Sequence, residues 1–153
     1  MSHSKTKILL ISLLLIMAVP VSAQEPIKIG LITPLTGAVS TYGQSVRNSV
    51  VMGIEQINAS GGINGRPIEL IILDDKGDGT ESAQAARRLM DRENVVLIIG
   101  PVITPAVMAV APIAQAEGIP MITPTGTGDE ITGIGDYIFR AAYKDSFQGS
   151  LMA

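Results

Sequence analysis

The stretch Val95-Val-Leu-Ile-Ile-Gly-Pro-Val-Ile-Thr-Pro105 decides the fold class of this chain. A short β-branched segment leads there into glycine, proline and threonine. Buried parallel strands have this composition, and ligands of open α/β sheets bind just beyond the carboxyl ends of such strands. The stretch Ile119-Pro-Met-Ile-Thr-Pro-Thr-Gly-Thr-Gly128 has the same pattern. Both strand exits offer small hydroxyls and free backbone amides, which indicates that the chain holds a small polar molecule and does not transform it.

Strand-like and helix-like segments alternate along the rest of the chain. We expect strands at 27–32, 68–73, 95–99, 120–122 and 137–140, and helices at about 41–58, 78–92, 104–118 and from 145 onward. Such alternation predicts βαβ units. The expected fold class is therefore α/β, with an open, Rossmann-like parallel sheet.

Three helix starts carry capping patterns. Asp78-x-x-Glu81 and Asp145-x-x-Gln148 have the spacing of a capping box, and Thr104-Pro105 is typical of an N-cap followed by proline at the first helical position. Pro112 is expected to bend the helix over 104–118. Because the helix from Asp145 has under three turns and no C-cap, we expect the chain to be part of a longer protein.

Residues 1–23 have the pattern of a secretory signal peptide. Lys5 and Lys7 precede an apolar stretch over 8–19, and Pro20-Val-Ser-Ala23 offers a small-x-small cleavage site. The apolar stretch is shorter than the about 20 residues that span a bilayer. We therefore expect cleavage after Ala23, a periplasmic or other extracytoplasmic location, and no stable membrane insertion afterwards. An uncleaved anchor is the alternative.

The composition of residues 24–153 excludes several classes of function. This part contains no cysteine and no histidine, because the single histidine is His3. The residues needed for a Ser-His-Asp or Cys-His mechanism, or for a zinc site with nitrogen or sulfur ligands, are therefore absent from this part. The acidic segment 74–78 fails the EF-hand pattern, since Lys76 stands at a ligand position. With nine basic and 14 acidic residues, this part lacks the excess of positive charge that indicates nucleic-acid binding. We expect no enzyme, no cofactor and no metal.

Four residues near the strand exits are candidate ligand contacts. If Thr104 caps its helix, the first-turn amides and the helix dipole favour a carboxylate there, although Thr104 would also fit a purely structural cap. Thr125 and Thr127 can accept hydrogen bonds from an ammonium group. Thr127 equally has the spacing of a cap for a short helix near 129–133. Tyr42 would cover an apolar part of a ligand or pack as an ordinary aromatic.

Together these segments resemble the periplasmic solute-binding proteins of the branched-chain amino acid type, which have the type I periplasmic binding fold. The residues that carry the resemblance are Ile27-Lys-Ile-Gly-Leu-Ile-Thr-Pro-Leu-Thr-Gly37, Ile57-Asn-Ala-Ser-Gly-Gly-Ile-Asn-Gly-Arg-Pro67, Leu73-Asp-Asp75, Gly100, Gly118-Ile-Pro-Met-Ile-Thr-Pro124 and Phe139-Arg140. The resemblance implies a receptor of two lobes that closes by hinge motion. Residues 24–153 would be its amino-terminal lobe, truncated in or near the crossover to the second lobe.

The resemblance also implies how a ligand is held. An aromatic after the first strand lies against the ligand, and this role falls on Tyr42. The exit of the third strand holds the carboxylate, which matches Val102, Ile103 and Thr104. A carbonyl and a hydroxyl after the fourth strand hold the α-ammonium, and this role falls on Thr125 and Thr127.

The implied function is that of an extracytoplasmic solute-binding component of an ABC importer. It would bind an amino acid or a similar small amphipathic solute between its lobes and deliver it to a membrane permease. A ligand-sensing domain of a receptor or signalling protein is the alternative, and a secreted enzyme would depend on carboxylates alone. The cysteine pair of the branched-chain receptors falls on Gly77 and Ile103, so this bridge is absent and leucine-type specificity stays open.

Overall fold

Five parallel strands form one sheet in the computed structural model, which describes residues 24–153. The expected signal peptide lies outside the described residues. The strand order is β2-β1-β3-β4-β5, and all four pairings are parallel. The strands are β1 (Ile27–Thr33), β2 (Ile68–Asp74), β3 (Leu97–Ile99), β4 (Met121–Thr123) and β5 (Ile138–Arg140). The expected α/β class with an open parallel sheet is confirmed.

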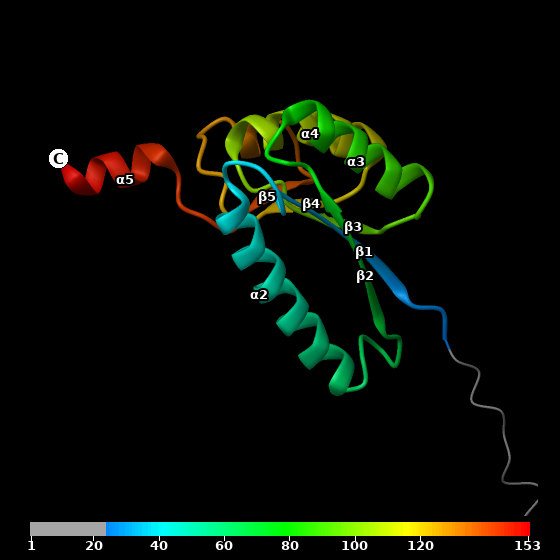
Figure 1. Cartoon of the computed structure of the whole chain (residues 1–153). Coiled ribbons are helices and arrows are strands. Elements are labelled where there is room, and N and C mark those ends of the chain that lie inside the picture. The colour runs from blue at the N-terminus through cyan, green and yellow to red at the C-terminus, as the bar shows by residue number, and fades with distance from the viewer. Residues whose placement is uncertain (1–23) are drawn as a thin grey trace, which may run out of the picture.

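Helices cover both faces of this sheet. They are α2 (Ser40–Ala59), α3 (Gly79–Asp91), α4 (Thr104–Glu117), the short 3₁₀ helix η1 (Ile131–Gly133) and α5 (Asp145–Met152). Figure 1 shows α3 and α4 on one face, α2 on the other, and α5 extending away from the body of the molecule. Within residues 24–153, none of the helices has both the length and the apolar character needed to cross a membrane.

The hydrophobic core lies between the sheet and the pair α3 and α4. Ile98 and Met121 are opposite each other in neighbouring strands, and both are completely buried. Leu89 of α3 and Val110 of α4 pack against this layer. Burial of one such side chain contributes roughly 1.5–3 kcal/mol. The packing against β1 is close, since a Cβ on Gly30 would lie 2.6 Å from Leu89 Cδ1.

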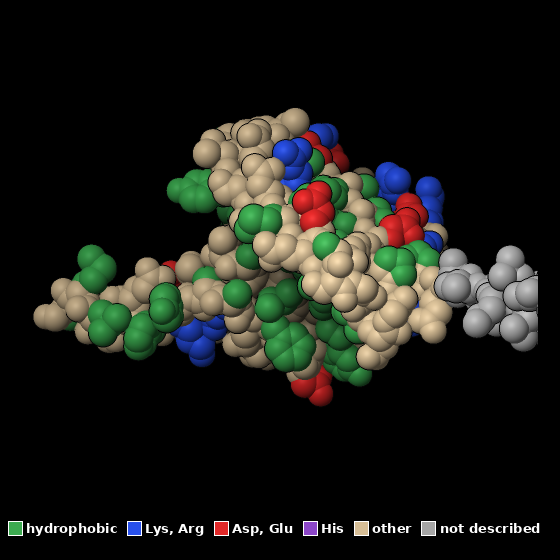
Figure 2. All heavy atoms as spheres, turned by 90° about the horizontal axis from the view of Figure 1, so that it is seen from below, with side chains coloured by type: hydrophobic (Ala, Val, Ile, Leu, Met, Phe, Trp, Pro, Cys, Tyr) green, Lys and Arg blue, Asp and Glu red, His purple; other side chains and the backbone are tan. Residues whose placement is uncertain are grey.

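The opposite face of the sheet is covered by α2 over β1 and β2. Ile99, Ile122 and Phe139 are consecutive partners across β3, β4 and β5, so they share this face. Ile99 and Ile122 are partly exposed, and Phe139 is half exposed. Figure 2, the view from below, shows hydrophobic side chains at the surface. This face is therefore less fully covered than the face under α3 and α4.

Only one of the three expected helix caps is confirmed. Asp78 caps α3, because its carboxylate accepts hydrogen bonds from the amides of Thr80 at 2.8 Å and Glu81 at 3.0 Å. The reciprocal bond of a capping box is absent, since the Glu81 carboxylate lies 3.3 Å from Lys76 Nζ instead. Asp145 is the first helical residue of α5, so its expected role as N-cap is wrong.

The expected cap at Thr104 is also wrong. The N-cap of α4 is Ile103, which has an extended backbone and makes no side-chain capping bond. Its carbonyl accepts the Val107 amide at 3.0 Å, so the first turn closes one residue earlier than expected. Thr104 is thus the first helical residue and Pro105 the second. The helix continues through Pro112, and a bend there stays a prediction.

The strand ends differ slightly from expectation. β3 begins at Leu97, whereas we expected Val95. The Val95 amide donates to the Leu89 carbonyl at 3.2 Å, so this residue still belongs to the connection from α3. β4 and β5 each begin one residue later than expected.

Candidate ligand-binding site

A hollow of about 220 Å³ lies beyond the carboxyl ends of β1, β3 and β4. The residues that line it are Val39, Tyr42, Val102, Ile103, Thr104, Thr125 and Thr127. All six residues singled out from the sequence therefore lie around one space. Val39 was not predicted. It lies just before the first turn of α2 and three residues before Tyr42, and this spacing, which places residues on one helix face, could have indicated it. Tyr42 is 67% exposed at the edge of the hollow.

Three side-chain hydrogen bonds join the exit of β3 to the exit of β4. The hydroxyl of Thr123 donates to the Pro101 carbonyl at 2.7 Å, and that of Thr125 donates to the Val102 carbonyl at 2.6 Å. In the other direction, the Gly128 amide donates to Thr104 Oγ1 at 3.2 Å. The two exits are thus one hydrogen-bonded unit, and it forms most of the wall of the hollow.

The start of α4 offers hydrogen-bond donors to this hollow. Within residues 24–153, the amide of Thr104 has no hydrogen-bond partner, and Pro105 has no amide to offer. Ala106 is completely buried and does not line the hollow. The Thr104 hydroxyl accepts from Gly128, so its own proton is free to be donated to a ligand. A carboxylate is the group that such a set of donors favours.

The exit of β4 offers acceptors, but fewer than expected. The Thr127 carbonyl already accepts the Asp145 amide at 3.0 Å and Arg140 Nη1 at 3.2 Å. The hydroxyl of Thr127 caps no helix, because the next helix, η1, begins only at Ile131. The Thr125 hydroxyl gives its proton to Val102, so toward a ligand it acts only as an acceptor. The hydroxyls of Thr125 and Thr127 thus suit a donor such as an ammonium group.

The loop that carries Val39, and that leads into α2 with Tyr42, is fixed by Asp74 at the end of β2. The Asp74 carboxylate accepts hydrogen bonds from the amide of Leu35 at 2.8 Å and from the hydroxyl of Thr36 at 2.6 Å. Burial raises the pKa of Asp74, but the hydrogen bonds, that from Thr36 foremost, outweigh it, so the net pKa is lowered. No group of three possible metal-ligating side chains is found among residues 24–153.

Asp75 lies beneath this loop and is 1% exposed. Its carboxylate accepts the Gly77 amide at 3.1 Å and lies 2.8 Å from Ser82 Oγ, which is also 2.6 Å from the Asp78 carbonyl. Ser82 has one proton for these two acceptors, whereas a protonated Asp75 would satisfy both. Burial raises the pKa of Asp75 and outweighs its hydrogen bonds.

We expect Asp75→Asn to stabilise the protein at neutral pH. A raised folded-state pKa means that Asp75 contributes stability below its unfolded pKa of about 3.9 and loses it as the pH rises through the folded-state pKa. The free energy of unfolding of the variant relative to the wild type should therefore increase over this window. Urea unfolding at a series of pH values measures the difference, with the exposed Asp91→Asn as control. Parallel pH curves for the wild type and Asp75→Asn would contradict the assignment.

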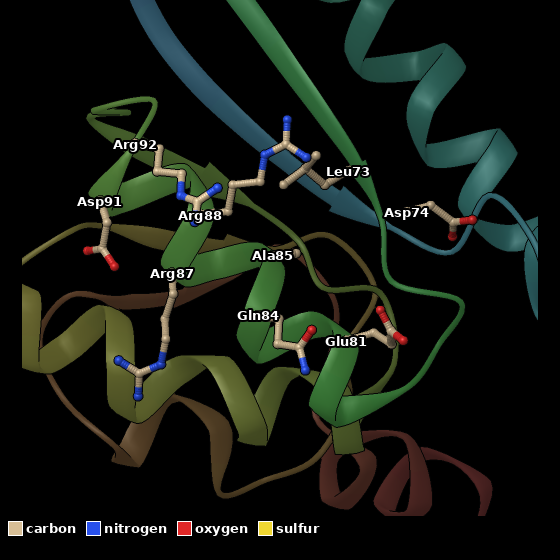
Figure 3. A pocket seen from close by; sticks show the side chains of 9 residues that line it. All are labelled: Leu73, Asp74, Glu81, Gln84, Ala85, Arg87, Arg88, Asp91 and Arg92. Carbon is tan, nitrogen blue, oxygen red and sulfur yellow. The ribbon is translucent and has the colours of Figure 1, made fainter.

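A larger hollow of about 600 Å³ lies along α3 and the end of β2. Figure 3 shows that Arg88 extends toward Leu73, whereas Arg87 and Asp91 point away from it. The charged side chains here have both signs, and Arg88 pairs with Glu93 at 3.6 Å on the surface. We interpret this hollow as the solvated outer face of α3, and the smaller hollow is the candidate site.

Gly77 and Ile103, where the resemblance implies a cysteine pair, are neighbours in this structure. A Cβ built on Gly77 would lie 3.7 Å from Ile103 Cδ1 and 2.7 Å from Val39 Cγ2. Ile103 and Val39 thus both lie beside Gly77, and both line the hollow, where the resemblance places a bridge.

Comparison with known proteins places the chain in a family. The family model described as periplasmic binding protein matches residues 26–153. The chain belongs to this family. A relative of this periplasmic binding protein chain is the leucine-, isoleucine-, valine-, threonine- and alanine-binding protein of Pseudomonas aeruginosa, with 38% identity over 128 residues, 83% of this chain and 34% of the relative. The chain thus spans about a third of the length of the curated relatives it matches.

Solved structures of the periplasmic binding protein family have the same fold. The branched-chain amino acid transporter substrate binding protein of Streptococcus pneumoniae, in complex with isoleucine, is 33% identical with a TM-score of 0.80, over 83% of this chain and 36% of that one. A solute binding protein of an ABC transporter from Rhodopseudomonas palustris, in complex with 3,4-dihydroxybenzoic acid, is 30% identical with a TM-score of 0.72, over 78% and 32%.

Proposed function

We propose that the complete protein is the extracytoplasmic solute-binding component of an ABC importer, and that the hollow is one wall of its ligand site. The observation that carries the proposal is the convergence of Thr104, Thr125 and Thr127 with apolar residues around one hollow at the strand exits. The names of the relatives, which are amino-acid-binding and transporter substrate-binding proteins, support the same class.

The ligand class follows from the groups around the hollow. The free amide and the hydroxyl of Thr104 would donate to a carboxylate, and the hydroxyls of Thr125 and Thr127 would accept from an ammonium group. The apolar part of the solute would lie against Val39, Tyr42 and Ile103. An aromatic acid such as 3,4-dihydroxybenzoic acid also has the carboxylate, and its phenolic hydroxyls can donate to the same acceptors, so it is the competing ligand class in the binding test.

We further propose that residues 1–23 are removed as a signal peptide and that residues 24–153 form the amino-terminal lobe of two. A hollow of about 220 Å³ is below the roughly 300–1,000 Å³ of ordinary ligand sites. A second lobe would close over it, supply the remaining contacts and permit delivery to a permease. The role proposed for the protein is binding and delivery, without catalysis.

We expect Thr127→Val to weaken amino-acid binding by the complete protein about tenfold or more, because a lost hydrogen bond to a charged group costs about 1.5–3 kcal/mol. Thr104→Val should have a similar effect. Titration calorimetry with L-isoleucine, L-leucine, L-alanine, L-threonine and 3,4-dihydroxybenzoate measures affinity and class together. The control is Thr80→Val, at an exposed position of α3. Unchanged affinity in both site variants would contradict the site, and absence of binding to all four amino acids would contradict the function.

A further inference from the structure

Arg140 holds the loop that carries two of the proposed ligand contacts. It is the last residue of β5 and is partly buried. Its Nη1 atom donates to the Gly128 carbonyl at 2.7 Å and to the Thr127 carbonyl at 3.2 Å. Within residues 24–153 the ion pairs are Lys76 with Glu81 and Arg88 with Glu93, so the guanidinium of Arg140 has no carboxylate partner there. Its charge is met by two backbone carbonyls instead.

Gly128 is held from the other side as well. Its amide donates to Thr104 Oγ1, while its carbonyl accepts from Arg140. A Cβ at this position would lie 2.6 Å from Thr104 Cγ2 and 2.9 Å from Glu130 Oε1, so the peptide fits closely between its neighbours. The position of this peptide therefore depends on Arg140 and on the wall of the hollow together.

The segment after β5 is bonded to the same loop. The Asp145 amide donates to the Thr127 carbonyl at 3.0 Å, and the Ser146 hydroxyl donates to Asp129 Oδ1 at 2.8 Å. These residues begin α5, which extends away from the body of the molecule in Figure 1. A displacement of this segment would thus act directly on the residues next to Thr125 and Thr127.

We propose that Arg140 is a positioning residue for the ligand site and couples the segment after β5 to it. By occupying the Thr127 carbonyl, the guanidinium removes this acceptor from the ligand and leaves the hydroxyls of Thr125 and Thr127 to bind the cationic group. The same bonds hold the loop at the distance from Thr104 that both ends of the ligand require. This inference rests on the proposed function, because it concerns the same site.

The test compares Arg140→Gln and Arg140→Lys in the complete protein with Arg87→Gln, a control on the exposed face of α3. Titration calorimetry with the four L-amino acids named above should give at least tenfold weaker binding for Arg140→Gln. Arg140→Lys keeps a cationic donor and should recover part of the affinity. A merely structural role would lower the melting temperature but leave the affinity of the folded protein within twofold of the wild type, and that result would overturn the inference.

A second measurement separates this inference from the proposed function. Hydrogen exchange of the Gly128 amide reports the position of the loop without any ligand, and it should be about tenfold faster in Arg140→Gln than in the wild type. Arg140→Lys should lie between the two and serves as the readout if the glutamine variant does not fold. Unchanged exchange would overturn the positioning role. If exchange is faster in Arg140→Gln but the wild type binds none of the amino acids, the positioning role is supported and only the proposed function is contradicted.

Discussion

Replacing Gly43 by alanine should lower the free energy of unfolding by about 3 kcal/mol, at the upper end of the cost of overpacking. Gly43 lies in the first turns of α2, where an added Cβ would overlap the carbonyl of Pro34, the buried residue that follows β1. The obstacle is backbone, so no side chain can rotate away. The Thr33 hydroxyl also donates to the Gly43 carbonyl at 3.1 Å, and a shift of the helix would break this buried bond.

Gly53 provides the matched control on the same helix. A Cβ at this position meets no atom within 4 Å. Gly53→Ala should therefore stabilise the protein by about 0.5–1 kcal/mol through helix propensity alone. Urea unfolding followed by circular dichroism gives both values. Equal effects of the same sign at the two positions would show that α2 does not pack on the exit of β1 as described.

Leu89→Ala should cost about 3–4 kcal/mol, because it leaves a cavity at the centre of the layer between the sheet and α3. Leu89 is completely buried and lies against Gly30 of β1. Gly30→Ala alone should also destabilise, by about 1–3 kcal/mol, since its Cβ would lie 2.6 Å from Leu89 Cδ1. Leu151→Ala, at a 72% exposed position of α5, is the control and should change stability by less than about 0.5 kcal/mol.

The double variant tests whether the two residues share one space. The added methyl group at position 30 would occupy part of the cavity left at position 89, so the combined loss should be smaller than the sum of the single losses by about 1 kcal/mol or more. The same unfolding measurements give this coupling. Strict additivity would contradict the packing between β1 and α3.

Much of the fold could be predicted because its signals are local. β-branched runs, the glycines between elements and the cap at Asp78 depend on neighbouring residues, and these features gave the element order and the parallel sheet. Parallel strands place their carboxyl ends at one edge, so the meeting of Tyr42, Thr104 and Thr125 around one hollow also followed from the pattern. The family resemblance supplied Val102 and Ile103.

The remaining features depend on contacts between distant segments. The Thr104 hydroxyl, which was expected to cap its helix, instead accepts the amide of Gly128, 24 residues away along the chain. Two other contacts have no local signature either. Arg140 donates to the Thr127 carbonyl, and the Asp74 carboxylate accepts from the loop after β1. A capping pattern gives a possible partner for a side chain, but tertiary contacts decide which partner it has.

The three hydrogen bonds that join the exits of β3 and β4 also bear on how quickly a solute could be captured. Ordering a residue costs roughly 1–2 kcal/mol, and for these loops that cost has been met during folding. Encounter would then require no rearrangement of this wall, so solutes of similar size should associate at similar rates. Discrimination among them would reside in the dissociation rate, and selectivity would become a matter of residence time.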